Sequence, residues 1–254
     1  MISNGKNMIS VFRTIEALNE SAAQLFVHLA EKSVMARGRF LLCLSGGNTP
    51  KGLYTLLSVN PYRDIIPWKN TFIFWSDERC VPADDKRNNA RMATEVLLKK
   101  IDIPSSNIFP VLVNLNPAEA ASNYEQTLRD FFGMKPPRFD LVLLGLGENG
   151  HTASLFSGTE VLREKSHWVK EVFVEELQRY RITMTAMLIN KAHNIVFLIT
   201  GKEKSDILNT VLTTPFQPEK YPVQLIRPEH GEVCWFVDDK AASGLPNELL
   251  NLAT

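Results

Sequence analysis

The fold is decided by the stretch Arg39-Phe40-Leu41-Leu42-Cys43-Leu44-Ser45-Gly46-Gly47-Asn48-Thr49-Pro50. Residues 39–44 form an almost continuous apolar run, which is typical of a strand buried on both faces of a parallel sheet. Gly46 and Gly47 predict a tight turn after that strand, and we expect Thr49 to cap a helix that Pro50 starts. A buried strand that leads directly into a helix is the building unit of an α/β sheet.

The same alternation of apolar runs and amphipathic segments continues on both sides of this stretch. Thr14 is available to cap the first helix, and no linker or internal repeat divides the chain. The sequence therefore predicts an α/β fold in which residues 1–254 form a single domain. Strands are expected at 71–75, 139–144, 193–199 and 233–237, and helices at 15–29, 88–99, 117–132 and 202–212, with a short helical segment near the C-terminus.

Composition excludes several classes of protein. The 28 basic and 28 acidic residues cancel, so no overall field attracts nucleic acid or an anionic membrane. No stretch reaches the ~18 apolar residues of a membrane span, and residues 1–7 lack the pattern of a signal peptide, so we expect a frayed, exposed start. The three cysteines, Cys43, Cys80 and Cys234, are odd in number and widely spaced, which argues against disulfides and favours the cytoplasm.

Ligands of open parallel sheets bind at the carboxyl ends of the strands, so the segments that follow the strands are the candidate site. In the first of these, Ser45-Gly46-Gly47-Asn48-Thr49, the backbone can approach a ligand closely and lead into a helix N-terminus, which attracts anions. The segment predicts a phosphate cradle. A tight turn without a ligand is the alternative.

The second segment is Ser76-Asp77-Glu78-Arg79-Cys80-Val81-Pro82, directly after a strand. Its Arg79 is suited to stabilise a developing oxyanion or to hold a phosphate. A surface cluster of ion pairs is the alternative, because charged loops are common. Asn88, Asn89 and Arg91 follow downstream and add polar side chains that could contact a ligand.

The third segment, 145–156, is a glycine-rich turn that delivers His151 beyond a buried strand. Histidine transfers protons near neutral pH, so His151 is a candidate acid or base. The alternative is a histidine that only hydrogen-bonds the backbone. Gly145, Gly147 and Gly150 have the GxGxxG spacing of dinucleotide sites, but no acidic residue further on confirms one.

Two further strand ends carry cations that could engage phosphate, Arg181 and Lys204. The histidines lack the spacing of metal ligands, and the serine-hydrolase pattern G-x-S-x-G is absent. We therefore expect neither a metal site nor a nucleophilic serine of that type.

In order along the chain, these segments resemble the 6-phosphogluconolactonase family. The resemblance covers nearly the whole chain between the first helix and the last strand, and no cofactor is implied by it. The matching blocks are Leu44-Ser45-Gly46-Gly47-Asn48-Thr49-Pro50, Trp75-Ser76-Asp77-Glu78-Arg79-Cys80-Val81-Pro82, Asn88-Asn89-Ala90-Arg91-Met92, 145–156, Arg181-Ile182-Thr183-Met184-Thr185 and Leu198-Ile199-Thr200-Gly201-Lys202-Glu203-Lys204.

Glucosamine-6-phosphate deaminases belong to the same superfamily and share its fold, so the fold alone does not separate the two activities. Their loops resemble G-H-I-A-F-N-E and M-D-E-Y, whereas this chain has Thr152-Ala153-Ser154-Leu155-Phe156 after its histidine and Arg79 at the end of S-D-E-R. Arg79 and Thr152 thus favour the lactonase over the deaminase.

The resemblance implies a modified Rossmann-like, mostly parallel sheet flanked by helices, with a small α/β annex. It implies hydrolysis of 6-phospho-D-glucono-1,5-lactone to 6-phosphogluconate in the oxidative pentose phosphate pathway. His151 would be the general base and Arg79 the oxyanion or phosphate stabiliser, with Asp77 as a third catalytic residue. The oligomeric state is left open, with a monomer as the working expectation. Substrate and phosphate contacts are expected from Ser45, Gly46, Gly47, Thr49, Asn89, Arg91, Gly150, Thr152, Arg181 and Lys204.

One residue departs from the family pattern. The family usually has aspartate immediately before the Gly-His of the loop, where this chain has Asn149. Either the role of that aspartate is structural, or Glu148 or Asp77 replaces it, or the chain is a catalytically impaired phosphosugar-binding protein.

Overall fold

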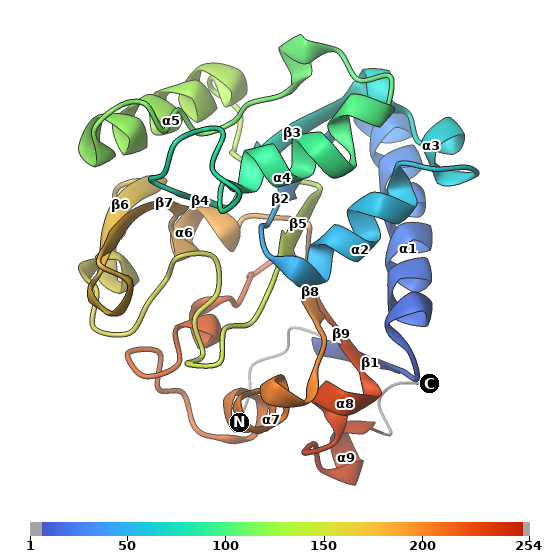
Figure 1. The fold of residues 1–254 in the computed structure, drawn as a ribbon, viewed down its shortest axis with the longest axis vertical. Helices are drawn as coiled ribbons and strands as arrows, with labels where there is room; N and C mark the ends of the chain where they lie inside the picture. The colour runs from blue at the N-terminus through green and yellow to red at the C-terminus, as the bar shows by residue number, and fades with distance from the viewer. Residues whose placement is uncertain (1–6, 251–254) are drawn as a thin grey trace.

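A computed structural model describes residues 7–250, with a six-stranded sheet at the centre (Figure 1). All neighbouring strands of this sheet run parallel, in the order β1-β9-β8-β5-β2-β3. Strand β2 is buried along its whole length, as the apolar run at 39–44 predicts. The strands are β1 (Asn7–Phe12), β2 (Phe40–Leu44), β3 (Thr71–Trp75), β5 (Leu141–Leu144), β8 (Asn194–Ile199) and β9 (Glu232–Asp238).

Helices cover both faces of this sheet. Leu42 and Leu44 of β2 pack in one core cluster with the helices α1 to α4, whereas Leu41 and Cys43 pack in a second cluster on the other face. This double burial is why the strand reads as a continuous apolar run. The first face carries α1 (Ile15–Arg37), α2 (Asn48–Leu57), α3 (Tyr62–Ile65) and α4 (Asn89–Val96), and the second carries α5 (Pro117–Phe132), α6 (Ala186–Ile189), α7 (Ser205–Thr213), α8 (Asp239–Ala242) and α9 (Asn247–Leu250).

A smaller antiparallel sheet, in the order β4-β7-β6, lies beside α5 (Figure 1). Its strands are β4 (Asp77–Arg79), β6 (Val169–Val174) and β7 (Arg179–Met184). Only Ser76 separates β4 from the central strand β3, and the Ser76 carbonyl accepts a hydrogen bond from the Met184 amide at 2.7 Å. This sheet is the small annex that the family resemblance implies.

The topology creates a crevice between β2 and β5. The chain leaves β2 for the edge strand β3 and later returns to β5 on the opposite side of β2, so the direction of strand addition reverses there. Ligand sites of open α/β sheets lie at such switch points, outside the carboxyl ends of the strands. Segments 45–49 and 145–152 both emerge at this point.

The fold class is confirmed, and several elements have the predicted positions. Helix α5 has the predicted bounds, and the Thr14 hydroxyl caps α1 by accepting the Ala17 amide at 3.1 Å. The prediction that Thr49 caps a helix is wrong. Helix α2 begins at Asn48, so its N-cap residue is Gly47, which has no side chain to cap it. Thr49 lies inside the helix, and its hydroxyl pairs with that of Thr200 at 3.1 Å.

The N-terminal part differs from the expectation. The frayed start expected for residues 1–7 falls on residues 1–6, outside the described residues, and on Asn7, which begins β1. Strand β1 pairs with β9 and buries Ile9, although the sequence did not indicate a strand there. Among residues 7–250, no helix has both the length and the apolarity needed to cross a bilayer.

Asp140 ties α1 to the sheet, and its removal should destabilise the fold. Its buried carboxylate accepts the Leu41 amide at 2.8 Å and pairs with Arg37 at 2.5 Å. We expect Asp140→Ala to lower the free energy of unfolding by about 2 kcal/mol, because a buried amide and a guanidinium lose their charged acceptor. Urea denaturation measures the change. Asp140→Asn keeps one acceptor and should lose less; equal stability of Asp140→Ala and the parent would contradict this assignment.

Candidate active site

A cleft of about 590 Å³ opens at the switch point between β2 and β5. Its walls come from the segments after β2, β5 and β8 and from strands β4 and β7 of the small sheet. The cleft thus collects segments from across the chain, as the strand-end argument predicts. Of the predicted site residues, it is lined by Ser45, Gly46, Gly47, Thr49, Asp77, Arg79, His151, Thr152, Arg181 and Lys204.

Backbone hydrogen bonds shape the loop that carries His151. The Gly147 amide donates to the His151 carbonyl at 2.8 Å, and the Gly150 amide donates to the Gly147 carbonyl at 3.0 Å. Gly150 has a φ of 80°, a conformation that L side chains avoid, which explains a glycine immediately before the histidine. The Thr152 hydroxyl donates to the Gly145 carbonyl at 2.8 Å and closes the loop.

The imidazole of His151 is held on two sides. Its Nδ1 lies 2.5 Å from the Asn149 side-chain oxygen, and its ring stacks on Phe156 with centroids 4.1 Å apart. Burial lowers the pKa of His151 to about 4, against the opposing effect of the Asp77 carboxylate. Nearby cations contribute to this lowering of the pKa, so the imidazole is neutral at pH 7 and able to accept a proton.

Asp77 connects the small sheet to the histidine loop. Its carboxylate accepts the Ser154 hydroxyl at 2.6 Å and lies 3.8 Å from the Arg181 guanidinium. The Asn89 side chain donates to the Asp77 carbonyl at 2.9 Å. With its carboxylate engaged by these neighbours, Asp77 acts on His151 through its charge, since no hydrogen bond joins the two side chains among the described residues.

Sequence reasoning missed the role of Glu78. Its carboxylate accepts the backbone amides of Arg79, Asn89 and Ala90 at 2.7–2.8 Å and so fixes β4 against the start of α4. Burial raises the pKa of Glu78 to about 7. A strand over residues 77–79 would have indicated that Glu78 points away from the cleft. Successive side chains of a strand point to opposite faces, so Asp77 and Glu78 cannot both face the ligand.

Three cations reach the cleft from three elements. Arg79 donates from Nη1 to the Arg87 carbonyl at 2.6 Å, whereas its buried Nε has no hydrogen-bond partner among residues 7–250. Arg181 pairs with Asp77, and Lys204 lies 3.5 Å from the Glu148 carboxylate. The start of α2 lines the same cleft and has no side-chain cap among the described residues, so its first amides are available to an anion.

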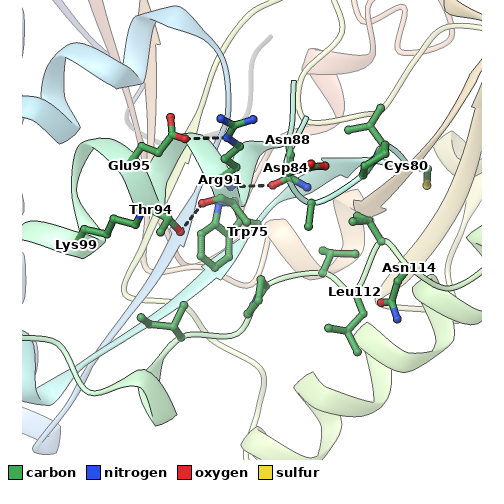
Figure 2. A pocket seen from close by; sticks show the side chains of 18 residues that line it. Trp75, Cys80, Asp84, Asn88, Arg91, Thr94, Glu95, Lys99, Leu112 and Asn114 are labelled. Carbon is green, nitrogen blue, oxygen red and sulfur yellow. Dashed lines mark hydrogen bonds and ion pairs between the residues drawn. The ribbon is translucent and has the colours of Figure 1, made fainter. Parts of the chain in front are cut away.

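Three predicted contact residues do not line this cleft. Arg91 pairs with Glu95 at 2.7 Å and lines a different, mainly apolar pocket of about 1050 Å³ beside Trp75 and Leu112 (Figure 2). Asn89 lies behind Gly46, where an added Cβ would come within 1.8 Å of its side-chain oxygen. Gly150 lies behind the histidine, and its carbonyl accepts the Val223 amide at 2.9 Å.

Comparisons with known proteins identify the family of the chain. Residues 13–235 match the family model described as glucosamine-6-phosphate isomerases/6-phosphogluconolactonase. A 6-phosphogluconolactonase of Synechocystis is 38% identical over 218 residues, which are 84% of this chain and 88% of the relative. One of Nostoc is 36% identical over 245 residues, which are 94% of this chain and 99% of the relative.

Solved structures give the same result. A Trypanosoma brucei 6-phosphogluconolactonase is 29% identical with a TM-score of 0.85, and the match covers 96% of this chain and 100% of the other. A monomeric glucosamine-6-phosphate deaminase has a TM-score of 0.78 at 24% identity, a likeness of fold alone. Family model, relatives and structures converge: the chain belongs to the 6-phosphogluconolactonase family, within the glucosamine-6-phosphate isomerase superfamily, and is by that homology a hydrolase of the pentose phosphate pathway.

Proposed function

We propose that this chain hydrolyses 6-phospho-D-glucono-1,5-lactone to 6-phosphogluconate, with His151 as the general base. The observation that carries the proposal is the position of His151 in a cleft that three cationic side chains also line, where burial lowers its pKa and keeps the imidazole neutral. A base must be unprotonated to activate water, and an anionic substrate needs cations to hold it. The cleft combines both requirements at the switch point of the sheet.

In the proposed reaction, His151 removes a proton from water as the water oxygen bonds to the lactone carbonyl carbon. The tetrahedral oxyanion then collapses, the bond from that carbon to the ring oxygen breaks, and the imidazolium returns its proton to the leaving ring oxygen. The acid product ionises at neutral pH. Arg79 is suited to stabilise the oxyanion, because its Nε has no hydrogen-bond partner among residues 7–250 and its guanidinium cannot lose its charge.

We assign the phosphate of the substrate to the part of the cleft that the start of α2 and Lys204 line. The uncapped start of α2 after Gly46 and Gly47 offers backbone amides, and Lys204 adds a charged donor. The Asp238 carboxylate accepts the Gly201 amide at 3.0 Å and anchors the turn that presents Lys204. Arg181 lines the same cleft and pairs with Asp77 at 3.8 Å, and it is a further charged donor for the substrate.

The proposal is tested by lactone hydrolysis measured above the spontaneous background, with deamination of glucosamine 6-phosphate assayed on the same preparation. We expect lactone hydrolysis without deamination. Deamination without lactone hydrolysis would assign the chain to the other branch of the superfamily. Binding of 6-phosphogluconate with neither activity would make it a phosphosugar-binding protein.

Lys204→Ala should weaken substrate binding more than turnover. Loss of one charged hydrogen bond to phosphate costs about 1.5–3 kcal/mol, so KM should rise roughly 10- to 100-fold while kcat changes little. Steady-state kinetics separates the two parameters. Lys202→Ala is the matched control, because Lys202 is exposed, bonds Ser243 at 2.7 Å and does not line the cleft. A fall in kcat at unchanged KM in Lys204→Ala would remove Lys204 from the phosphate site.

A further inference from the structure

The proposed mechanism needs one particular tautomer of His151. A neutral imidazole carries a proton on one nitrogen and a lone pair on the other, and only the nitrogen with the lone pair accepts a proton from water. Nδ1 faces the loop, since it lies 2.5 Å from the Asn149 oxygen and an added Cβ on Gly147 would come within 2.0 Å of it. Nε2 is therefore the nitrogen left for the cleft that His151 lines.

The orientation of the Asn149 amide follows from a second hydrogen bond. The backbone amide of His151 also points to the Asn149 side-chain oxygen, at 3.3 Å. An NH₂ group in that place would face this N–H donor, so the network requires the oxygen there. An oxygen next to Nδ1 is an acceptor, and it therefore needs a proton on Nδ1.

We propose that Asn149 is the positioning residue that selects the tautomer of His151, holding the proton on Nδ1 and leaving the lone pair on Nε2. The side chain does this without charge. A carboxylate in the same position would select the same tautomer and would also favour the imidazolium, which raises the pKa. The amide leaves the imidazole neutral, in line with the low pKa that burial gives His151.

The charged groups around the ring come from four segments. Within residues 7–250, Asp77 is the carboxylate that raises the pKa of His151, and three cations lower it. Glu148, on the histidine loop itself, is exposed and directed to a cation at 3.5 Å. These groups are Asp77 and Arg79 on β4, Arg181 on β7, Lys204 after β8 and Glu148 before Asn149. A negative charge at position 149 would therefore raise the pKa of His151, which these groups and burial now keep low.

The tautomer is measured directly by ¹⁵N NMR of histidine-labelled protein near pH 7, with the His151 signals assigned by their loss in His151→Gln. We expect a protonated Nδ1 and an unprotonated Nε2. In Asn149→Leu, which keeps the approximate size but removes the acceptor, the Nε2–H form should appear. A protonated Nε2 in the parent protein would overturn the proposal. Asn149 is exposed, so these variants should fold.

The kinetic part of the inference rests on the proposed lactone hydrolysis. Asn149→Leu should lower kcat about 10²-fold at unchanged KM, because the wrong tautomer abolishes most general-base catalysis. Asn149→Asp should retain turnover but shift the acidic limb of kcat/KM to higher pH by about one unit or more. A residue with only a structural role would leave that limb in place, so superimposable profiles would refute the assignment. If the parent protein and all variants failed to hydrolyse the lactone while NMR showed the expected tautomer, the proposed function would be rejected. The assignment of the tautomer to Asn149 would still hold.

Discussion

His151→Ala should lower kcat for lactone hydrolysis by about 10²- to 10⁴-fold, the contribution that a positioned general base makes. The remaining cations and helix amides of the cleft do not depend on the imidazole. Affinity for 6-phosphogluconate should therefore stay close to that of the parent protein. Single-turnover kinetics and product binding by calorimetry, both on purified protein, measure the two effects separately.

The control for His151→Ala is His193→Ala. His193 lies immediately before β8 and does not line the cleft. Its replacement should leave kcat for the lactone near the parent value. If His151→Ala kept kcat within a few-fold of the parent while His193→Ala behaved as expected, another group would have to activate the water.

Gly147→Ala should reduce turnover by about 10²-fold without removing a functional group. An added Cβ would come within 2.0 Å of Nδ1 and 2.1 Å of Cε1 of His151, so the ring must move. This movement disturbs both the stack on Phe156 and the bond to Asn149. A displacement of about 1 Å at a catalytic group costs roughly 10² in rate.

Gly145→Ala provides the matched comparison for this substitution. It adds the same methyl group two residues earlier, where an added Cβ meets no atom within 4 Å, and it should lose much less activity. Both rates come from the same lactone assay, and thermal unfolding checks that both proteins are folded. Equal activity of the two variants would show that the ring tolerates the methyl group and that its position is not critical.

Most of the central sheet could be predicted from the sequence, because a strand that is buried on both faces is a nearly continuous run of apolar residues. Strands β2, β3, β5, β8 and β9 are apolar runs followed by turns or helices. The edge strand β1 leaves Met8 44% exposed and so lacks such a run. Strand β4 is short and charged, and its partner β7 follows about a hundred residues later, so no local pattern reveals their pairing.

The candidate site was also predicted only in part. Strand-end reasoning brought His151, Arg79 and Lys204 to one cleft, because parallel strands deliver their carboxyl ends to one edge. The same reasoning wrongly included Arg91, which lines the neighbouring pocket. The direction of a side chain on a helix depends on tertiary packing, which the spacing of residues in the sequence does not determine. The contact between Asn149 and Nδ1 depends on two side-chain rotamers, which only coordinates supply.

Because the cleft forms only when the central sheet is folded, ligand binding is coupled to the folding stability of the chain. The walls of the cleft are separated by more than 150 residues in sequence, from Ser45 to Lys204, so an unfolded chain does not hold the residues of the site together. A sugar phosphate that binds only the native state shifts the folding equilibrium by mass action, by about 2.7 kcal/mol at a hundred times its Kd. In a cell where the pentose phosphate pathway is active, sugar phosphates of that pathway would stabilise the folded enzyme. They would thereby slow its degradation.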